Sequence, residues 1–463
     1  MLCVVCRGSA NVRPGVHARR VHARRGLALT VAVLSVIATL GCPRDTSDGP
    51  GSIVLVILDT VRADHLSCYG YERPTTPELD RLASEGVRFD QAWSQSSWTL
   101  PAVTTILTGH PPHVHGAGRG AERFYTLRDE VPTLAERLAE NGYRTAAFIN
   151  VVWCDPESGL ARGFETYDHR TSDATNLGQR TAGETTDAAL RWASSLSDEP
   201  FFLVVHYFDP HLTYDAPEPY DSMFETGTAE PIARGFGSAG DVHQIRRGVL
   251  PLGPGQRTSL VARYDGELRY TDDQFGRLRN GLEALGLWND SLVVVVADHG
   301  EEFWDHHGFE HGHSHYRELL RVPLIVRRPG GTQGVVNDDR VRQLDIAPTL
   351  LEFAGLPVPD ALPGRPLGRS SAEFSLAEGT LWGGQLASVR SDGGTLIWDR
   401  ARDRHAFFGP DDPGEKRPLP PARAPADLIE LLRMLPSVRA GEDAPWVLTE
   451  EQLERLRALG YVK

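Results

Sequence analysis

Two uninterrupted apolar runs dominate the hydropathy pattern, and each of them ends at an aspartate. Residues 53–58 (IVLVIL) precede Asp59, and residues 292–297 (LVVVVA) precede Asp298. Uninterrupted apolar runs of this length predict strands that are buried on both faces, as in the centre of a parallel sheet. Because open parallel sheets bind ligands beyond the carboxyl ends of their strands, both aspartates are predicted to face one crevice.

Strand-like segments alternate with helical patterns along most of the chain. Strands are predicted at 52–58, 87–92, 144–149, 201–206, 292–297 and 322–326, and helices at 77–83, 101–107, 132–142, 185–196, 259–285 and 343–353. This alternation predicts a doubly wound α/β fold with a mostly parallel central sheet flanked by helices. Residues 213–258, which are rich in proline and glycine, are predicted to form a long irregular excursion over the site.

The pattern changes near Pro357. Short hairpin-like strands, a proline-rich link and a final helix at 449–459 follow; the strands are expected at 388–390, 394–398 and 406–408. We therefore predict a large domain over residues 52–356 and a small C-terminal α+β subdomain over residues 357–463.

The N-terminal segment has the pattern of an export signal. A basic region precedes the apolar stretch 26–40, which is shorter than the about 20 residues of a membrane span. The tripeptide Leu40-Gly41-Cys42 resembles a bacterial lipoprotein signal, in which Cys42 would carry the lipid. Residues 1–41 are thus predicted to be the signal and residues 42–51 a linker. The protein is expected in the bacterial periplasm or anchored to a membrane, with ordinary cleavage or an uncleaved anchor as the alternatives.

Charge and cysteine content narrow the class of protein. The net charge is −14, and the basic N-terminal segment makes the remainder still more acidic, so nucleic acid is not expected as a partner. A small anionic substrate is not excluded, because a bound divalent ion sets the local field.

The cysteine content does not indicate a disulfide framework. Three of the five cysteines lie in or next to the signal, and the remaining two are too few for such a framework. Cys68 and Cys154 could pair in an oxidising compartment. No pattern indicates an oligomeric state.

A candidate nucleophile lies in the turn Ser97–Pro101. Thr99 precedes a helix expected to start at or near Pro101, so the positive end of the helix dipole would lie beside its hydroxyl. Asp59, Thr99 and the adjacent Asp298-His299 make a four-ligand set for a divalent ion. A metal-bound alcohol is a stronger acid, so Thr99 could attack as an alkoxide. Asp59 or Thr99 alone would be interpreted as a turn or cap residue; their joint occurrence favours the functional interpretation.

Several motifs resemble those of the sulfatase family, within the alkaline phosphatase superfamily. They are Leu58–Leu66, Tyr69–Tyr71, Thr76–Asp80, Thr99–Pro101 with Leu107–Gly109, Ala297–Glu302, Arg321–Val326 and the closing Leu456–Val462. The resemblance covers residues 52–356 well and the tail loosely. It implies an alkaline-phosphatase-like fold, cleavage of small sulfate or phosphate esters, and Asp59, Thr99, Asp298 and His299 as the metal shell.

The resemblance also implies substrate contacts by histidines. His211, in the segment Tyr207–His211, is expected to contact the substrate or to assist the leaving group. His311 or His313 lies where the family often has a substrate-binding lysine or histidine, and we favour His313. The resemblance implies one divalent ion, which could be calcium, manganese or zinc, and leaves a second ion open.

Three positions depart from the family pattern. Thr60 stands where many sulfatases have a metal-binding aspartate, Thr99 where they have the cysteine or serine that becomes formylglycine, and Val103 where they have an arginine. Threonine cannot become that aldehyde, so water must attack the central atom of a threonyl intermediate, which is familiar for phosphate. The mechanism therefore favours phosphoryl chemistry, although the family name favours sulfate esters. The imidazole of His299 favours manganese or zinc over calcium.

We therefore predict an exported metal-dependent hydrolase with Thr99 as the nucleophile. Two alternatives remain open. One is an envelope transferase that moves a phospho-headgroup onto a lipid or glycan with the same residues. The other is an inactive anion-binding homologue, suggested by the departures at Thr60 and Val103.

Overall fold

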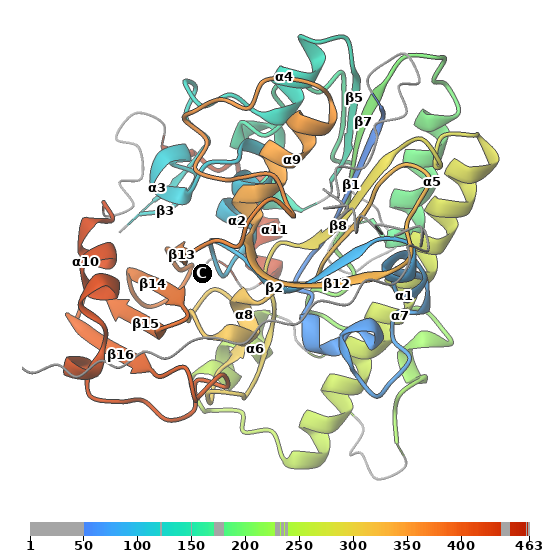
Figure 1. The fold of residues 1–463 in the computed structure, drawn as a ribbon. Helices are drawn as coiled ribbons and strands as arrows, with labels where there is room; N and C mark the ends of the chain where they lie inside the picture. Colours follow the sequence, from blue (N-terminus) through green and yellow to red (C-terminus); the bar gives the residue numbers. More distant parts are fainter. Residues whose placement is uncertain are drawn as a thin grey trace, which may run out of the picture. The chain divides into compact units, whose positions relative to one another are not determined.

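The fold is built on an eight-stranded sheet with the strand order β12-β2-β11-β8-β1-β7-β5-β6 (Figure 1). The strands are β1 (Ile53–Leu58), β2 (Val87–Trp93), β5 (Arg144–Phe148), β6 (Thr166–Asp168), β7 (Phe201–Tyr207), β8 (Leu292–Ala297), β11 (Leu324–Arg327) and β12 (Val335–Arg342). This computed structural model describes residues 51–120, 123–149, 151–170, 180–226, 232, 236, 239–436, 445–459 and 461. The predicted export signal lies outside these residues, as does the predicted linker up to residue 50.

The central strands are parallel and fully buried. β1 pairs with β7 on one side and with β8 on the other, both in parallel, and every residue of these three strands is buried. β11 is antiparallel to both of its neighbours, β8 and β2, so the sheet is mixed but mostly parallel. The predicted doubly wound α/β fold is confirmed, and the β-branched, apolar composition of the central strands explains their position in the core.

Helices lie on both sides of this sheet (Figure 1). The described helices are α1 (Pro77–Ser84), α2 (Thr99–Thr108), α3 (Pro112–His115), α4 (Leu134–Ala139), α5 (Ala182–Ala193), α6 (Ala239–Arg246), α7 (Pro254–Ala284), α8 (Arg317–Leu320), α9 (Ile346–Phe353), α10 (Ala426–Met434) and α11 (Glu450–Ala458). Helix α7 contacts both α1 and α5, and α2 contacts α4 and α9. None of the described helices is both long enough and apolar enough to cross a membrane.

A second sheet of four antiparallel strands confirms the predicted C-terminal subdomain. It contains β13 (Ser375–Glu378), β14 (Leu386–Ser391), β15 (Gly394–Asp399) and β16 (Arg404–Phe408). Helix α10 covers one face through Leu428 and Leu432. Two two-stranded ribbons, β3 (Gly118–Arg119) with β4 (Phe124–Tyr125) and β9 (Glu302–Phe303) with β10 (Phe309–Glu310), complete the described strands. Residues 49–463 group into one compact unit, so the division predicted at residue 356 stays a prediction.

Several details differ from the sequence-based expectation. Helix α2 begins at Thr99, two residues before Pro101. The excursion predicted as irregular contains α6 and the start of α7. Strand β12 was not predicted, because it is a polar and partly exposed edge strand without an apolar run. Cys68 and Cys154 are both free thiols, so the pairing considered from the sequence is absent.

Candidate active site

Three neighbouring strands bring ligand-type side chains to one point. Asp59 directly follows β1, Asp298 directly follows β8, and His206 lies near the end of β7. One ligand atom from each of these residues lies within 4.8 Å of the others, and all three side chains are completely buried. The parallel register explains this meeting, since Leu58 pairs with both Tyr207 and Ala297. Asp59 and Asp298 therefore meet at one end of the sheet, as predicted.

His299 links this group to Thr99. Its Nε2 atom lies 3.3 Å from Asp298 Oδ2, 3.9 Å from Asp59 Oδ1 and 3.3 Å from Thr99 Oγ1. Its Nδ1 atom donates to the carbonyl oxygen of Gly300 at 2.9 Å. A carbonyl oxygen only accepts, so the neutral imidazole presents the lone pair of Nε2 toward the carboxylates and the hydroxyl. This lone pair can accept the Thr99 proton or bind a cation.

The ligand-type side chains of this group carry polar atoms without hydrogen-bond partners. Both carboxylate oxygens of Asp59, Oδ2 of Asp298 and both ring nitrogens of His206 have no hydrogen-bond partner among the described residues. Burial, followed by the carboxylates of Asp298 and Glu301, raises the pKa of Asp59 well above its ordinary value. Burial, followed by the nearby His299, lowers the pKa of His206 to about 3. His206 is therefore neutral and does not neutralise Asp59, although its Nε2 lies 3.5 Å from Asp59 Oδ2.

A divalent cation fits this donor set. Unpaired buried carboxylates are costly, and a cation removes that cost while neutral imidazole and hydroxyl complete its shell. Asp59, Asp298, His206 and His299 could hold the ion, with the Thr99 hydroxyl beside it. Thr99 is the first residue of α2, so free N–H groups of the first helical turn lie next to its side chain.

Two histidines approach the site from the opposite side. The ring centroid of His311 lies 4.5 Å from that of His299 and 5.0 Å from that of His211. His311 Nδ1 lies 3.0 Å from Glu301 Oε1, and burial raises the pKa of Glu301 to about 7. Both imidazoles also bond the hydroxyl of Tyr461. The structure thus brings His211 and His311 together next to His299.

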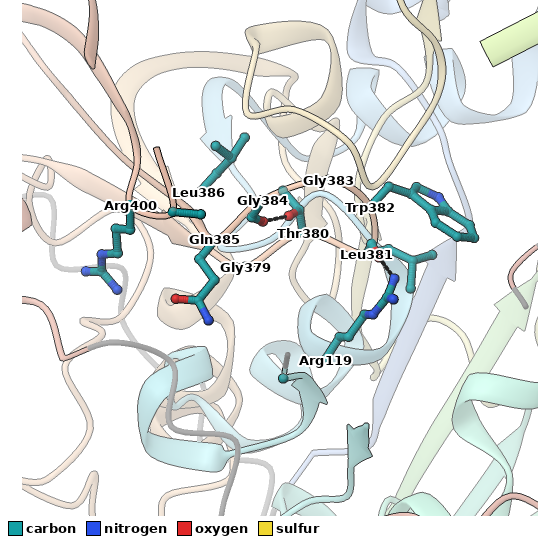
Figure 2. Close-up of a pocket in the computed structure, with 12 residues that line it drawn as sticks. Arg119, Gly379, Thr380, Leu381, Trp382, Gly383, Gly384, Gln385, Leu386 and Arg400 are labelled. Atoms are coloured by element: carbon teal, nitrogen blue, oxygen red, sulfur yellow. Dashed lines mark hydrogen bonds between the residues drawn. The ribbon is translucent and has the colours of Figure 1, made fainter. Parts of the chain in front are cut away.

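A loop of the C-terminal sheet lies against this group of histidines. The N–H groups of Leu381 and Trp382 both donate to the carbonyl oxygen of Gly312 at 2.8 Å. The same loop lines a cavity of about 280 Å³ together with Arg119 and Arg400 (Figure 2). Trp382 therefore stands between this cavity and the buried residues of the candidate site.

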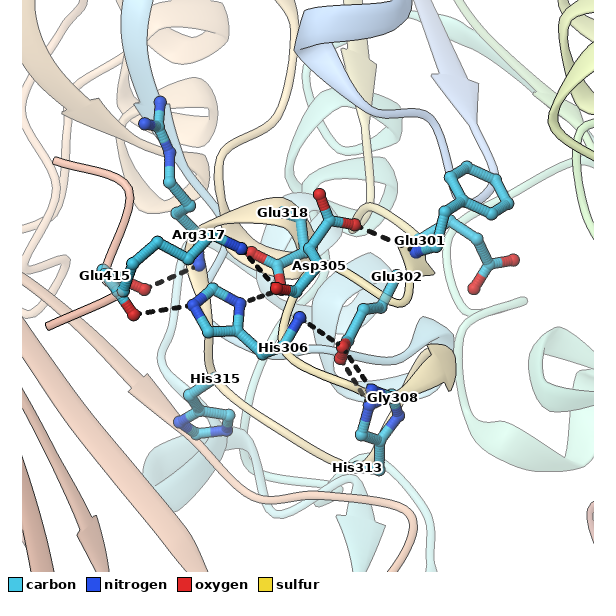
Figure 3. Close-up of polar contacts among 12 residues, drawn as sticks. Glu301, Glu302, Asp305, His306, Gly308, His313, His315, Arg317, Glu318 and Glu415 are labelled. Carbon is cyan, nitrogen blue, oxygen red and sulfur yellow. Dashed lines mark hydrogen bonds and ion pairs between the residues drawn. The ribbon is translucent and has the colours of Figure 1, made fainter. Parts of the chain in front are cut away.

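His313, which we favoured over His311, lies elsewhere in the loop. Its Nε2 atom pairs with Glu302 Oε2 at 2.7 Å (Figure 3). None of its described contacts reaches the predicted metal ligands. Glu302 also accepts from the N–H groups of His306 and Gly308, and His306 in turn pairs with Glu318 at 2.6 Å. These contacts give His313 and His306 a role in shaping the loop, whereas His311 faces the site.

Sequence reasoning missed three residues of this site. His206 carried a signal, because it is a polar residue in an otherwise apolar strand that pairs beside Asp59. Glu301 lies within the motif Ala297–Glu302, yet only the fold shows that it meets His311. Tyr461 lies in the closing segment that resembles the family, but nothing in its local sequence indicates contact with His211.

Comparison with known proteins gives one family and several relatives. The family model described as Sulfatase matches residues 52–356. An arylsulfatase of Clostridium perfringens is 26% identical over 373 residues, which cover 68% of this chain and 76% of that protein. A solved phosphonate monoester hydrolase from Silicibacter pomeroyi is 24% identical, with a TM-score of 0.67 over 83% of this chain and 94% of that one.

A second solved structure has a similar fold. It is of a protein in complex with its substrate D-glucosamine-2-N,6-O-disulfate, 20% identical with a TM-score of 0.69, over 83% of this chain and 97% of that one. At these identities the two structures establish the fold, which is the alkaline-phosphatase-like α/β architecture predicted from the sequence.

Asp59→Asn is predicted to stabilise the metal-free protein at neutral pH. The folded-state pKa of Asp59 is raised, so its stability cost is absent below the unfolded pKa of about 3.9 and grows as the pH rises toward the folded pKa. Asparagine removes that charge. Melting temperatures in a chelating buffer between about pH 4 and 8 check this. The exposed Asp411→Asn serves as the control, and a lower melting temperature for metal-free Asp59→Asn at neutral pH would contradict the assignment.

Proposed function

Since the chain belongs to the sulfatase family and is a hydrolase of sulfuric or phosphoric esters, we propose that a divalent ion held by Asp59 and Asp298 activates Thr99 as the nucleophile. The observation that carries this proposal is the position of the Thr99 hydroxyl. It lies 3.3 Å from an imidazole nitrogen whose lone pair also faces an unpaired oxygen of each of the buried carboxylates Asp59 and Asp298.

Each residue of the site has its own role in the proposed reaction. When bound, the ion would offset the negative charge of the ester and increase the acidity of the Thr99 hydroxyl. Because the lone pair of His299 Nε2 is committed to the proposed metal shell, the Thr99 hydroxyl passes its proton to water as Oγ1 bonds to the phosphorus or sulfur atom. The ester bond breaks, and its electron pair goes to the leaving oxygen. This oxygen takes the Nε2 proton of His311, while Glu301, whose pKa is raised to about 7 by burial, gives its proton to His311 Nδ1. Water then attacks the same central atom, which releases the inorganic anion and restores Thr99.

Threonine favours phosphorus over sulfur as the central atom. The covalent intermediate cannot collapse to an aldehyde, so it must be opened by water at its central atom, and this is ordinary chemistry for a phosphate ester. Val103 is buried and supplies no positive charge to the transferred group, whereas the first turn of α2 supplies N–H donors. The fold shared with a phosphonate monoester hydrolase is compatible with this preference.

His206 replaces a carboxylate in the proposed metal shell. Thr60, which stands where many relatives are expected to have an aspartate, donates its hydroxyl to the carbonyl oxygen of Pro210 at 2.9 Å. Its side chain is thus engaged away from the carboxylates, while its N–H donates to Asp298 Oδ1 at 3.2 Å. A shell with two imidazoles and two carboxylates favours manganese or zinc over calcium.

His206→Ala is predicted to weaken manganese or zinc binding by about tenfold or more, because it removes one ligand from a small shell. His206→Asp should restore binding with a shift toward calcium and magnesium, which prefer oxygen ligands. Competition with a chromogenic chelator measures both affinities. His405→Ala, which changes a histidine stacked on Trp398 outside the site, is the matched control. Unchanged affinity in His206→Ala would remove His206 from the shell.

Thr99→Ala is predicted to fold and bind metal but to lose turnover by roughly three orders of magnitude or more, as expected when a nucleophile is removed. Thr99→Ser keeps a hydroxyl and should retain measurable activity. Steady-state assays on matched aryl phosphate, phosphonate, phosphodiester and sulfate esters check this and rank the ester classes. Wild-type turnover by Thr99→Ala would show that another group attacks. Product analysis with an added acceptor alcohol separates hydrolysis from headgroup transfer.

Export and lipidation at Cys42 remain our proposal, because residue 42 lies outside the described part of the chain. They rest on the basic region, the short apolar stretch and the tripeptide that precede Pro43. Cys42→Ala in the full-length chain should abolish labelling by a clickable fatty acid and move the protein from the membrane to the soluble periplasmic fraction. Absence of label on the wild-type protein would refute lipidation. Retention of the wild-type protein in the cytoplasm would refute export.

A further inference from the structure

The hydroxyl of Tyr461 lies where two catalytic-site histidines converge. His311 Nε2 is 3.1 Å from this oxygen, and His211 Nε2 also bonds it. Tyr461 itself is 2% exposed. The two ring nitrogens that face the site are therefore both occupied by one oxygen atom that belongs to the protein.

The hydrogen positions follow from the partners. His211 Nδ1 donates to the carbonyl oxygen of Leu212 at 2.6 Å, so Nε2 of the neutral ring is an acceptor and takes the Tyr461 proton. The Tyr461 oxygen then has only lone pairs left, so His311 Nε2 donates to it, and His311 Nδ1 accepts the hydrogen of the Glu301 carboxyl group 3.0 Å away. An N–H donated to an alcohol oxygen is what a leaving oxygen receives from a general acid. The Tyr461 oxygen thus has the hydrogen-bond environment of a leaving group.

The ring of Tyr461 fills a slot with aromatic walls. Trp153 meets it edge-on at 5.3 Å between centroids, and Trp382 stacks on it at 6.4 Å. The rings of His211 and His311 lie at 5.9 Å and 6.1 Å. Walls of this kind suit a planar ring, and one of them, Trp382, also borders the cavity of Figure 2.

One helix holds Tyr461 in the slot. In α11, Arg455 pairs with Asp155 at 3.1 Å, and Gln452 Nε2 donates to the same carboxylate at 3.2 Å. The N–H of Tyr461 donates to the carbonyl oxygen of Leu456 at 2.8 Å, which ties the residue to the end of the helix. Because these contacts tie Tyr461 to α11 and not to the central sheet, its withdrawal requires movement at the end of α11 only.

The candidate site is closed while Tyr461 is in place. Thr99, His211 and His299 are all 2% exposed or less. An ester can bring its leaving oxygen between His211 and His311 only if the Tyr461 oxygen moves away, because one position cannot hold two oxygens.

We propose that the slot filled by Tyr461 is the leaving-group subsite of this enzyme, that it takes a ring-shaped alcohol such as a phenol, and that Tyr461 withdraws when the ester binds. This proposal rests on the proposed function of the site. The leaving oxygen takes the place of the Tyr461 oxygen, receives the electron pair of the broken ester bond and takes the proton of His311 Nε2, while His311 Nδ1 takes the proton of Glu301.

The test is 4-methylphenol, which reproduces the tyrosine side chain, with Tyr461→Ala and Tyr461→Phe in the metal-loaded full chain. Calorimetry should detect 4-methylphenol binding to Tyr461→Ala and none to the wild type at the same concentration. The KM for a phenyl ester should fall about tenfold in Tyr461→Ala, because a closed state populated at about 90% lowers apparent affinity by that factor. In Tyr461→Ala, 4-methylphenol should inhibit competitively.

Two variants serve as controls for this test. Tyr461→Phe keeps the packing of the ring but loses the hydroxyl, so it should show a smaller fall in KM and no binding of 4-methylphenol, even if Tyr461→Ala folds poorly. Tyr220→Ala removes a half-buried tyrosine that bonds Asp273 outside the site, and it should leave KM and phenol binding unchanged.

Two results would overturn the proposal. If 4-methylphenol restores lost turnover to Tyr461→Ala, Tyr461 is part of the working site and does not stand in for substrate. If 4-methylphenol binds no variant, the slot is not a subsite. Phenol binding is measured without turnover, so the two proposals can fail separately. If the proposed function is wrong, the wild type and all variants are inactive, while Tyr461→Ala still binds 4-methylphenol.

Discussion

Two carboxylates buried side by side without a positive partner are the constraint on which the candidate site depends. Asp59 and Asp298 are placed together by the parallel pairing of β1 and β8, and neither can turn toward solvent. Burial raises the pKa of both groups, which expresses the cost of ionising them there. Neutral His206 does not relieve this cost, whereas a divalent cation would. In our proposal, this ion in turn gives the nearby Thr99 hydroxyl its reactivity.

The central strands and the loops that follow them have separate roles in this arrangement. The strand order β8-β1-β7 sets the ligands Asp298, Asp59 and His206 on a rigid frame at one end of the sheet. The loop after β8 then carries His299 toward Thr99 and His311 toward the space above it. The rigid strands thus explain the metal ligands, whereas the loop and the tail explain the part of the site that meets the leaving group.

The central strands and their terminal aspartates could be predicted because uninterrupted apolar runs have few other structural explanations. The antiparallel direction of β11 could not, since a short apolar strand has the same pattern in either direction. The choice between His311 and His313 depends on the path of the loop, in which Glu310 and Gly312 adopt positive φ angles of 70° and 75°. Tyr461 meets His311 across 150 residues of sequence, and no local pattern predicts such a contact.

The central claim is that one cation sits among Asp59, Asp298, His206 and His299 beside Thr99. Anomalous X-ray diffraction from crystals grown with manganese tests it most directly, because the signal locates the ion independently of the protein. The account predicts one strong peak about 2.0–2.3 Å from carboxylate oxygens of Asp59 and Asp298 and from a ring nitrogen of His206. A peak confined to the loop around His306 and His313, or no peak between the two aspartates, would contradict it.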